Sequence, residues 1–224
     1  MTHHVLLAGG TGLVGTRLTR LLSTRHDVAL TSLVRTPRFP AERAIDFEAL
    51  AADPLGATGP IRVDVGISCL GTTLRKAGSQ AAFRRVDHGY VLAVARAALG
   101  KGAGQFIMVS SVGAGGSGFY LRVKGEVEEA LKSLGFARLD IIRPGLILGE
   151  RQERRPIERL AQQIAPLLNP LLVGGLRRYA SVSADTVAAA IASLIGRTEP
   201  GCHIHQSPEL GNLAGQAIES TRSR

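Results

Sequence analysis

Three glycines spaced three residues apart, Gly9, Gly12 and Gly15, constrain the fold of this chain more than any other feature. A short apolar run at 4–9, HVLLAG, leads into them, and the stretch LVGTRLTRLLSTR at 13–25 follows with apolar residues at helical spacing. The segment predicts a strand, a tight glycine turn and a helix. In this arrangement the first glycine forms the turn, the second lets the backbone approach a pyrophosphate, and the third lets the helix pack close to the sheet.

The same loop predicts a site for a dinucleotide cofactor. A helix N-terminus presents unpaired N–H groups to phosphate, and the glycines lie between strand and helix as that use demands. A plain glycine turn is the less favoured alternative. The cofactor-binding residues expected in the loop are Gly9, Thr11, Gly12, Leu13, Val14 and Gly15.

Two arginines follow the second expected strand, VALTSLVR, where NAD-binding proteins place an acidic residue against the adenosine ribose. The residues in that region are Arg35 and Arg38, and a guanidinium suits a 2′-phosphate. The sequence therefore predicts NADP(H) as the cofactor. Two solvated loop arginines are the alternative, because the chain contains twenty-three arginines against four lysines.

Apolar strands alternate with helices along most of the remaining chain. The further strands are expected at 28–35, 44–47, 63–71, 105–111 and 138–145. The further helices are expected at 80–102, at 120–134 with Gly135 as the cap, and at 184–196 after an N-cap at Ser183. This order predicts an α/β protein with a doubly wound parallel sheet covered by helices on both faces. One domain over 1–224 is expected, with a small C-terminal elaboration that carries substrate or lid elements at about 146–182.

A tyrosine and a lysine four residues apart, Tyr120 and Lys124, open the helical stretch GFYLRVKGEVEEAL. Residues at this spacing share one helix face, so the hydroxyl and the ammonium can meet the same ligand, and a neighbouring cation favours a phenolate. The strand before them ends in Ser110 and Ser111, where parallel strands present their carboxyl ends to a ligand. Each feature is common by chance, but their conjunction with a dinucleotide loop indicates a catalytic site.

The motifs GGTGLVG, CLGTT, VSSVGA, YLRVK and IIRPG, in this order, resemble the short-chain dehydrogenase/reductase superfamily over nearly the entire chain. Within it, CLGTTLRKAG, YLRVKGEVE and RPGLILGERQERRP are similar to the small atypical members related to the Tat-interacting protein oxidoreductases, which bind NADPH. The resemblance implies a Rossmann-type fold. Two features depart from the pattern. The interval between serine and tyrosine is short and glycine-rich, and the helix has no asparagine near Asp87 and His88. No role is assigned to Asp87 or His88.

The resemblance also implies roles for individual residues. Tyr120 would be the general acid/base, Lys124 would favour its phenolate and hold the nicotinamide ribose, and Ser111 would orient the substrate, with Ser110 as the alternative. The implied cofactor contacts, from adenine to nicotinamide, are Asp46, Phe47, Cys69, Leu70, Gly71, Thr72, Lys124, Pro144, Gly145, Leu146 and Ile147. A strand terminus with one core aromatic is an equally good interpretation of Asp46 and Phe47.

Two functions fit these features. The first is an NADPH-dependent reductase that acts on a small carbonyl substrate. The second is an NADPH-binding redox sensor or scaffold protein with little or no catalysis, because a fold alone does not decide function. The apolar stretch IAPLLNPLLVGGL at 164–176 could be core, lid or interface, which leaves a homodimer open.

Composition excludes several other classes. The net charge of +9 invites a nucleic-acid partner, but the arginines are scattered and the chain has three tyrosines and no tryptophan, so none is expected. The absence of an apolar run of roughly 18 residues and of a signal peptide predicts a cytoplasmic protein without a membrane partner. Cys69 and Cys202 are interpreted as ordinary small apolar residues. His203 and His205 lack a third ligand, so no metal is expected and both are interpreted as polar outward positions of a strand.

Overall fold

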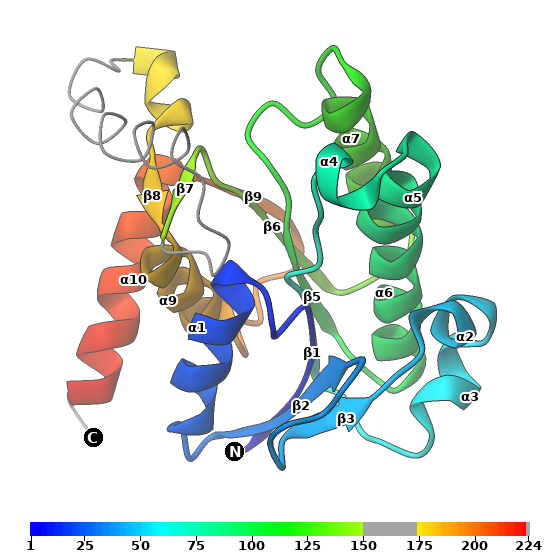
Figure 1. Cartoon of the computed structure of the whole chain (residues 1–224). Coiled ribbons are helices and arrows are strands. Elements are labelled where there is room, and N and C mark those ends of the chain that lie inside the picture. Colours follow the sequence, from blue (N-terminus) through cyan, green and yellow to red (C-terminus); the bar gives the residue numbers. More distant parts are fainter. Residues whose placement is uncertain (150–173, 223–224) are drawn as a thin grey trace.

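A seven-stranded sheet forms the centre of the protein in a computed structural model that describes residues 1–149 and 174–222 (Figure 1). The strand order is β3-β2-β1-β4-β5-β6-β9, and every pairing in it is parallel. The strands are β1 (His3–Ala8), β2 (Val28–Val34), β3 (Glu42–Ala44), β4 (Val65–Ser68), β5 (Gln105–Val109), β6 (Arg138–Arg143) and β9 (Gly201–Gln206). A separate pair, β7 (Ile147–Leu148) and β8 (Val182–Ser183), is also parallel.

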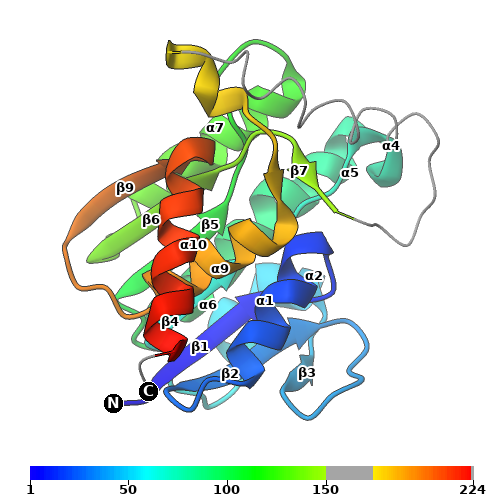
Figure 2. The same cartoon turned by 90° about the vertical axis from the view of Figure 1, so that its left-hand side faces the viewer.

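Helices cover both faces of this sheet. One face carries α2 (Phe47–Ala52), α3 (Pro54–Thr58), α5 (Gln80–Arg84), the π-helix η1 (Arg85–Tyr90), α6 (Val91–Gly100) and α7 (Phe119–Lys132). The other face carries α1 (Leu13–Ser23), α9 (Ala184–Leu194) and α10 (Ser207–Arg222), which stand in front of the sheet in Figure 2. The short α4 (Leu74–Ala77) and the 3-10 helix η3 (Gly174–Tyr179) complete the described elements. The expected doubly wound α/β fold is confirmed.

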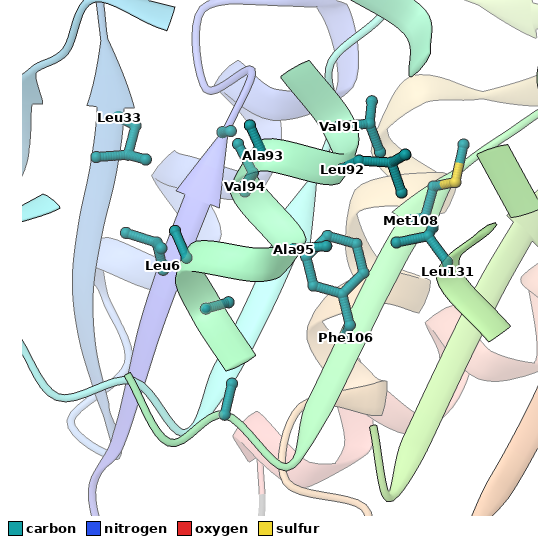
Figure 3. Close-up of a cluster of buried hydrophobic side chains, with 14 of the residues drawn as sticks. Leu6, Leu33, Val91, Leu92, Ala93, Val94, Ala95, Phe106, Met108 and Leu131 are labelled. Carbon is teal, nitrogen blue, oxygen red and sulfur yellow. The ribbon is translucent and has the colours of Figure 1, made fainter. Parts of the chain in front are cut away.

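Alternating strand residues supply the two cores. In β1, Leu6 and Ala8 face α6, whereas Val5 and Leu7 face α1 and α9. Figure 3 shows the first of these cores, where Phe106 of β5 lies among small and branched side chains of α6. Strands buried on both faces explain the nearly continuous apolar runs in the sequence.

The third strand differs from its prediction over 44–47. It ends at Ala44, and Asp46 instead caps α2 by accepting a hydrogen bond of 2.9 Å from the N–H of Glu48. A short acidic side chain satisfies the unpaired N–H groups of a helix start, so the Asp-Phe pair begins a helix. Phe47 then turns into the core beneath that helix.

The predicted long helix at 80–102 is present but is not uniform. It consists of α5, the π-helix η1 and α6 in direct succession and ends at Gly100. A π-helix accommodates an additional residue within a helix and is often found at functional sites. This one contains Asp87, whose side chain is buried.

The C-terminal region departs from two expectations. His205 is buried, so its interpretation as a polar outward position was wrong, and Cys202, interpreted as an ordinary small apolar residue, is exposed. Strand β9 is at the edge of the sheet next to β6, and Nε2 of His205 lies 2.9 Å from Asp140. Of the expected substrate elements at 146–182, the stretch 150–173 lies outside the described residues, as does most of IAPLLNPLLVGGL.

Within the part of the chain that the structure describes, no helix combines the length and the apolar character needed to cross a membrane.

A polar network around His205 joins four elements, β9, α10, β6 and β5. Its Nδ1 lies 2.9 Å from Glu209 at the start of α10, and Asp140 also receives hydrogen bonds from Arg138 and Gln105. Burial alone would lower the pKa of His205, but its hydrogen bonds to Asp140 and Glu209 outweigh that effect and raise the pKa. The folded chain therefore holds the His205 proton more tightly than the unfolded chain.

This linkage predicts a pH-dependent stability. The contribution of His205 is complete below its unfolded pKa, about 6.5, and is lost as pH rises through the higher folded pKa. Urea unfolding between about pH 5.5 and pH 8.5 should show the loss in the native protein and a flatter curve in His205→Gln. The exposed His26→Gln should keep the native pH dependence, and identical curves for His205→Gln and the native protein would contradict the prediction.

Candidate functional site

The carboxyl ends of the central strands meet at one edge of the sheet, and the sequence-predicted residues follow them. Ala8 of β1 pairs with Ser68 of β4, and Ser68 pairs with Met108 of β5. The segments that continue from these strands therefore lie together. The strand order also reverses between β1 and β4, and this reversal is where open parallel sheets bind ligands.

The glycine loop after β1 packs against the backbone that follows β4. Gly9 has φ +85°, and a Cβ at this position would lie 2.5 Å from the carbonyl carbon of Cys69. A Cβ on Gly15 would collide with the carbonyl oxygen of Gly9, so α1 approaches the loop as closely as backbone atoms allow. Both glycines have the geometric role expected of them.

The N-terminus of α1 lacks a side-chain cap. Gly12 is the N-cap residue, and the first turn contains no acidic residue. Five other helices begin with a residue whose side chain accepts a hydrogen bond from a backbone N–H of the first turn. These N-cap residues are Asp46, Asp53, Thr73, Ser79 and Ser183. The first N–H groups of α1 therefore remain available for an anion.

The other loop residues contribute in different ways. Thr11 and Gly12 are exposed, whereas Val14 is buried in the core and can offer a ligand only its backbone. The side chain of Leu13 lies against Gly149, because a Cβ on Gly149 would be only 3.0 Å from Cδ1 of Leu13.

Arg35 and Arg38 are both exposed in the loop after β2. The backbone N–H of Arg38 donates to Glu42 at 2.6 Å. Among the described residues, neither guanidinium has a hydrogen bond or an ion pair. Both are free to meet an anionic group, and their role in cofactor binding stays a prediction.

The expected adenine contacts lie beside a second tyrosine. Phe47 packs on Tyr90 with ring centroids 5.3 Å apart, and the Tyr90 hydroxyl donates to Glu48 at 2.8 Å. Burial and the Glu48 carboxylate raise the pKa of Tyr90, which keeps its phenol protonated. Asp46 is exposed but already caps α2, so any contact of Asp46 and Phe47 with a nucleotide stays a prediction.

The segment CLGTT at 69–73 lies next to the glycine loop. Cys69 donates its N–H to Ala8 at 2.8 Å, and burial raises the pKa of its thiol to about 12. The thiol is therefore protonated and offers no nucleophile at neutral pH. Gly71 is exposed, and the N–H of Thr72 donates to Asp87 at 2.8 Å.

Tyr120 and Lys124 lie one turn apart near the start of α7, as the sequence predicted. The Tyr120 ring packs against Phe83 with centroids 5.6 Å apart, and its hydroxyl has no hydrogen bond among the described residues. Lys124 is only 3% exposed, and its Nζ lies 2.8 Å from Oδ1 of Asp87. The carboxylate was not expected here, although Asp87 is the one acidic residue of the predicted helix at 80–102, a signal that could have identified it.

The two candidate serines have different partners. Ser110 is buried and donates its hydroxyl to the buried carboxylate of Glu128, which also pairs with Arg143 at 3.1 Å. The hydrogen bond that Arg143 donates to Glu128 raises the pKa of Arg143, so the guanidinium stays charged. Ser111 is half-buried, and within residues 1–149 and 174–222 its hydroxyl makes only a bond of 3.3 Å to the carbonyl of Val112.

The short interval between serine and tyrosine folds back on α7. Gly115 donates its N–H to the carbonyl of Leu121 at 2.8 Å, and a Cβ on Gly125 would lie 2.6 Å from Gly115. Three glycines of this loop have positive φ, namely Gly113, Gly115 and Gly118. The glycine content therefore lets a short loop reach the helix directly.

The segment after β6 borders the same edge. Pro144 accepts a hydrogen bond of 3.0 Å from the N–H of Val112, which ties it to the serine loop. Gly145 donates to the Ser207 hydroxyl at 2.7 Å, Leu146 is exposed, and Ile147 enters β7. No cluster of three or more potential metal ligands occurs within residues 1–149 and 174–222.

Comparison with known proteins shows close sequence relatives. The chain is 37% identical over 199 residues to protein fmp52, mitochondrial, of Aspergillus niger, and the match covers 84% of each protein. It is 41% identical over 156 residues to protein HTATIP2 of Rattus norvegicus, covering 69% of this chain and 62% of that protein. No protein-family model matches.

The fold also resembles solved structures of lower identity. The human epimerase family protein SDR39U1, crystallised with NADPH, matches with a TM-score of 0.66 and 19% identity. The match covers 92% of this chain and 74% of that chain. At this identity the likeness concerns the fold.

The expectation of a cytoplasmic protein is wrong, because Aspergillus relatives are named as mitochondrial proteins. That expectation rested on the lack of an apolar span and of a secretory signal peptide. Neither feature distinguishes the cytoplasm from the interior of an organelle.

The different partners of Ser110 and Ser111 predict that their alanine variants differ in stability. Ser110→Ala would leave the buried Glu128 without one donor, which should reduce the free energy of unfolding by about 1–3 kcal/mol. Ser111→Ala removes only a weak contact and should change the free energy of unfolding by less than about 0.5 kcal/mol. Urea denaturation of both variants measures the difference, and equal losses would refute the assignment of Ser110 as the structural serine.

Proposed function

Because the chain belongs to the family that includes fungal fmp52 and mammalian HTATIP2, an atypical branch of the short-chain dehydrogenases/reductases, we propose that it is an NADP(H)-dependent oxidoreductase acting on a small carbonyl substrate. The observation that carries the proposal is the placement of Tyr120 and Lys124 one turn apart on α7, where the Tyr120 hydroxyl has no hydrogen bond among the described residues and the Lys124 ammonium is buried. Lys124 lies beside Gly71, in the segment that packs against the glycine loop.

The residues present fit the proposed cofactor. The close glycine packing at Gly9 and the uncapped N-terminus of α1 suit a pyrophosphate. The guanidinium groups of Arg35 and Arg38, which have no partner in the described part of the chain, suit a 2′-phosphate. Lys124 would hold the nicotinamide ribose through the donors that its carboxylate partner leaves unused. The NADPH in the SDR39U1 structure is consistent with this choice.

The chain's own groups would supply the proton and the orientation. NADPH, when bound, would provide the hydride for the carbonyl carbon. Tyr120 would give its phenolic proton to the carbonyl oxygen, so that the product is an alcohol. Ser111 would donate a hydrogen bond to the same oxygen, because Ser110 already donates its only hydroxyl proton to Glu128.

Two observations favour the second candidate, an NADPH-binding sensor or scaffold with little catalysis. Lys124 and Ser110 are each already engaged by a buried carboxylate. A sensor would bind NADPH and change its protein partner without consuming the cofactor. A pulldown whose bound partner depends on NADPH, together with no turnover, would support this candidate. A homodimer remains compatible with either function.

Substitution of the tyrosine tests the reductase. Tyr120→Phe should lower NADPH oxidation by about 10²–10⁴-fold, because the proton donor is lost, while NADPH binding stays close to native. The measurement follows NADPH absorbance with a panel of aldehydes, ketones and quinones. Tyr90→Phe, which removes a hydroxyl bound to Glu48, is the matched control and should retain turnover. Full turnover by Tyr120→Phe would exclude the proposed acid.

Charge reversal tests the cofactor choice. Arg35→Asp and Arg38→Asp should each lower the ratio of NADPH to NADH affinity by about tenfold or more, because a carboxylate repels the 2′-phosphate. Binding constants from cofactor fluorescence provide the measurement. Arg20→Asp, at an exposed position in α1, carries the same charge change and should leave the ratio unchanged. An unaltered ratio in both loop variants would remove the basis for NADP(H).

A further inference from the structure

The carboxylate of Asp87 holds two groups of the candidate site at once. Its Oδ1 lies 2.8 Å from Nζ of Lys124, and its Oδ2 accepts the N–H of Thr72 at 2.8 Å. The residue is only 1% exposed. A buried carboxylate is unfavourable unless its partners compensate. Here Oδ2 accepts a hydrogen bond, whereas Oδ1 has no hydrogen bond among the described residues and is compensated by the ammonium of Lys124 as an ion pair.

The two partners belong to different parts of the site. Lys124 lies on α7, whereas Thr72 lies in the segment 69–73 beside the glycine loop. A Cβ on Gly71 would lie 3.6 Å from Oδ1 of Asp87 and 3.9 Å from Nζ of Lys124. The backbone of this segment therefore lies directly on the ion pair.

The π-helix places Asp87 between these elements. Phe83 of the preceding α5 packs against Tyr120, and Val91 of the following α6 is buried in the core. The additional residue in the π-helical turn lets the carboxylate face α7 while the helix on each side keeps its own packing.

We propose that Asp87 is a positioning residue that fixes the Lys124 ammonium and links it to the segment 69–73. The proposal rests on the function proposed above, in which this ammonium holds the cofactor. The ion pair places the Lys124 ammonium beside Asp87, and N–H donors of the ammonium are left for the ribose. Asp87 thus compensates the charge of the lysine and determines where it is presented.

Removal of the carboxylate should make Lys124 a buried cation without a counterion. Burial then favours the neutral amine, so the lysine should lose its proton more readily than in the native protein. The other titratable or charged groups on the elements around Lys124 are Arg85, Asp87, His88 and Tyr90 on η1, Tyr120, Arg122, Glu126, Glu128, Glu129 and Lys132 on α7, Arg138, Asp140 and Arg143 on β6, and Cys69 directly after β4. Glu128 is neutralised by Arg143 and cannot replace Asp87 as the partner.

A double-mutant cycle on NADPH binding tests this role. Asp87→Asn retains an oxygen to accept the Thr72 N–H but removes the charge, and it should weaken NADPH binding by about tenfold. Lys124→Met should weaken it by a similar factor. The double variant should bind no more weakly than Lys124→Met alone, because Asp87 acts through the lysine.

The pH dependence of binding provides a readout that a purely structural role would not change. The affinity of Asp87→Asn for NADPH should fall further between about pH 7 and pH 9, whereas the native affinity stays nearly constant. Glu129→Gln removes an exposed carboxylate from the same helix and should behave as the native protein. Independent losses that multiply in the double variant, or a pH-independent Asp87→Asn, would overturn the proposal.

The design separates this inference from the proposed function. Asp87→Asn alone leaves the Lys124 charge buried, which can prevent stable folding. In that case the double variant, which contains neither buried charge, should recover cooperative unfolding and a Tm above that of Asp87→Asn. Failure to recover either would count against the pairing of Asp87 with Lys124. If the native protein binds NADPH without oxidising it, the reductase hypothesis is refuted, but the double-mutant cycle on NADPH binding can still be interpreted. Native protein that does not bind NADPH would overturn both.

Discussion

The close approach of the β1–α1 turn to the end of β4 determines the geometry of the rest of the site. Here backbone meets backbone without an intervening side chain, since a Cβ on Gly9 would lie 2.7 Å from the N–H nitrogen of Leu70. This contact aims the N-terminus of α1 at the sheet edge and holds the segment 69–73 in place. The buried ion pair can then reach that segment through the N–H of Thr72.

Two buried carboxylates divide the polar groups of the site into those held by the fold and those left for a ligand. Tyr120, Lys124 and Glu128 follow one another at intervals of four residues along α7. Asp87 engages the lysine, and Glu128 engages Ser110 and Arg143. The Tyr120 hydroxyl and Ser111 remain outside these pairings, so the fold itself selects among residues that look equivalent in the sequence.

The sequence was sufficient for the sheet, for the glycine loop and for the position of Tyr120 and Lys124, because these depend on periodicity and on local spacing. It was insufficient where a residue's role depends on a distant partner. Asp46 resembled a strand end until its cap on α2 was visible, and His205 resembled a surface position until Asp140 and Glu209 were placed around it. Asp87 is the clearest case, since its lysine partner is thirty-seven positions later in the chain.

The π-helix has a consequence for which changes in length this chain can tolerate. Each residue of a helix rotates the following ones by about 100° about its axis, so deleting one residue within Arg85–Tyr90 would restore a regular helix and turn the two flanking helices relative to each other. Either Phe83 would leave Tyr120 or the apolar face of α6 would leave the sheet. Sequence length at this turn is therefore as constrained as residue identity, even though no glycine or proline marks its start.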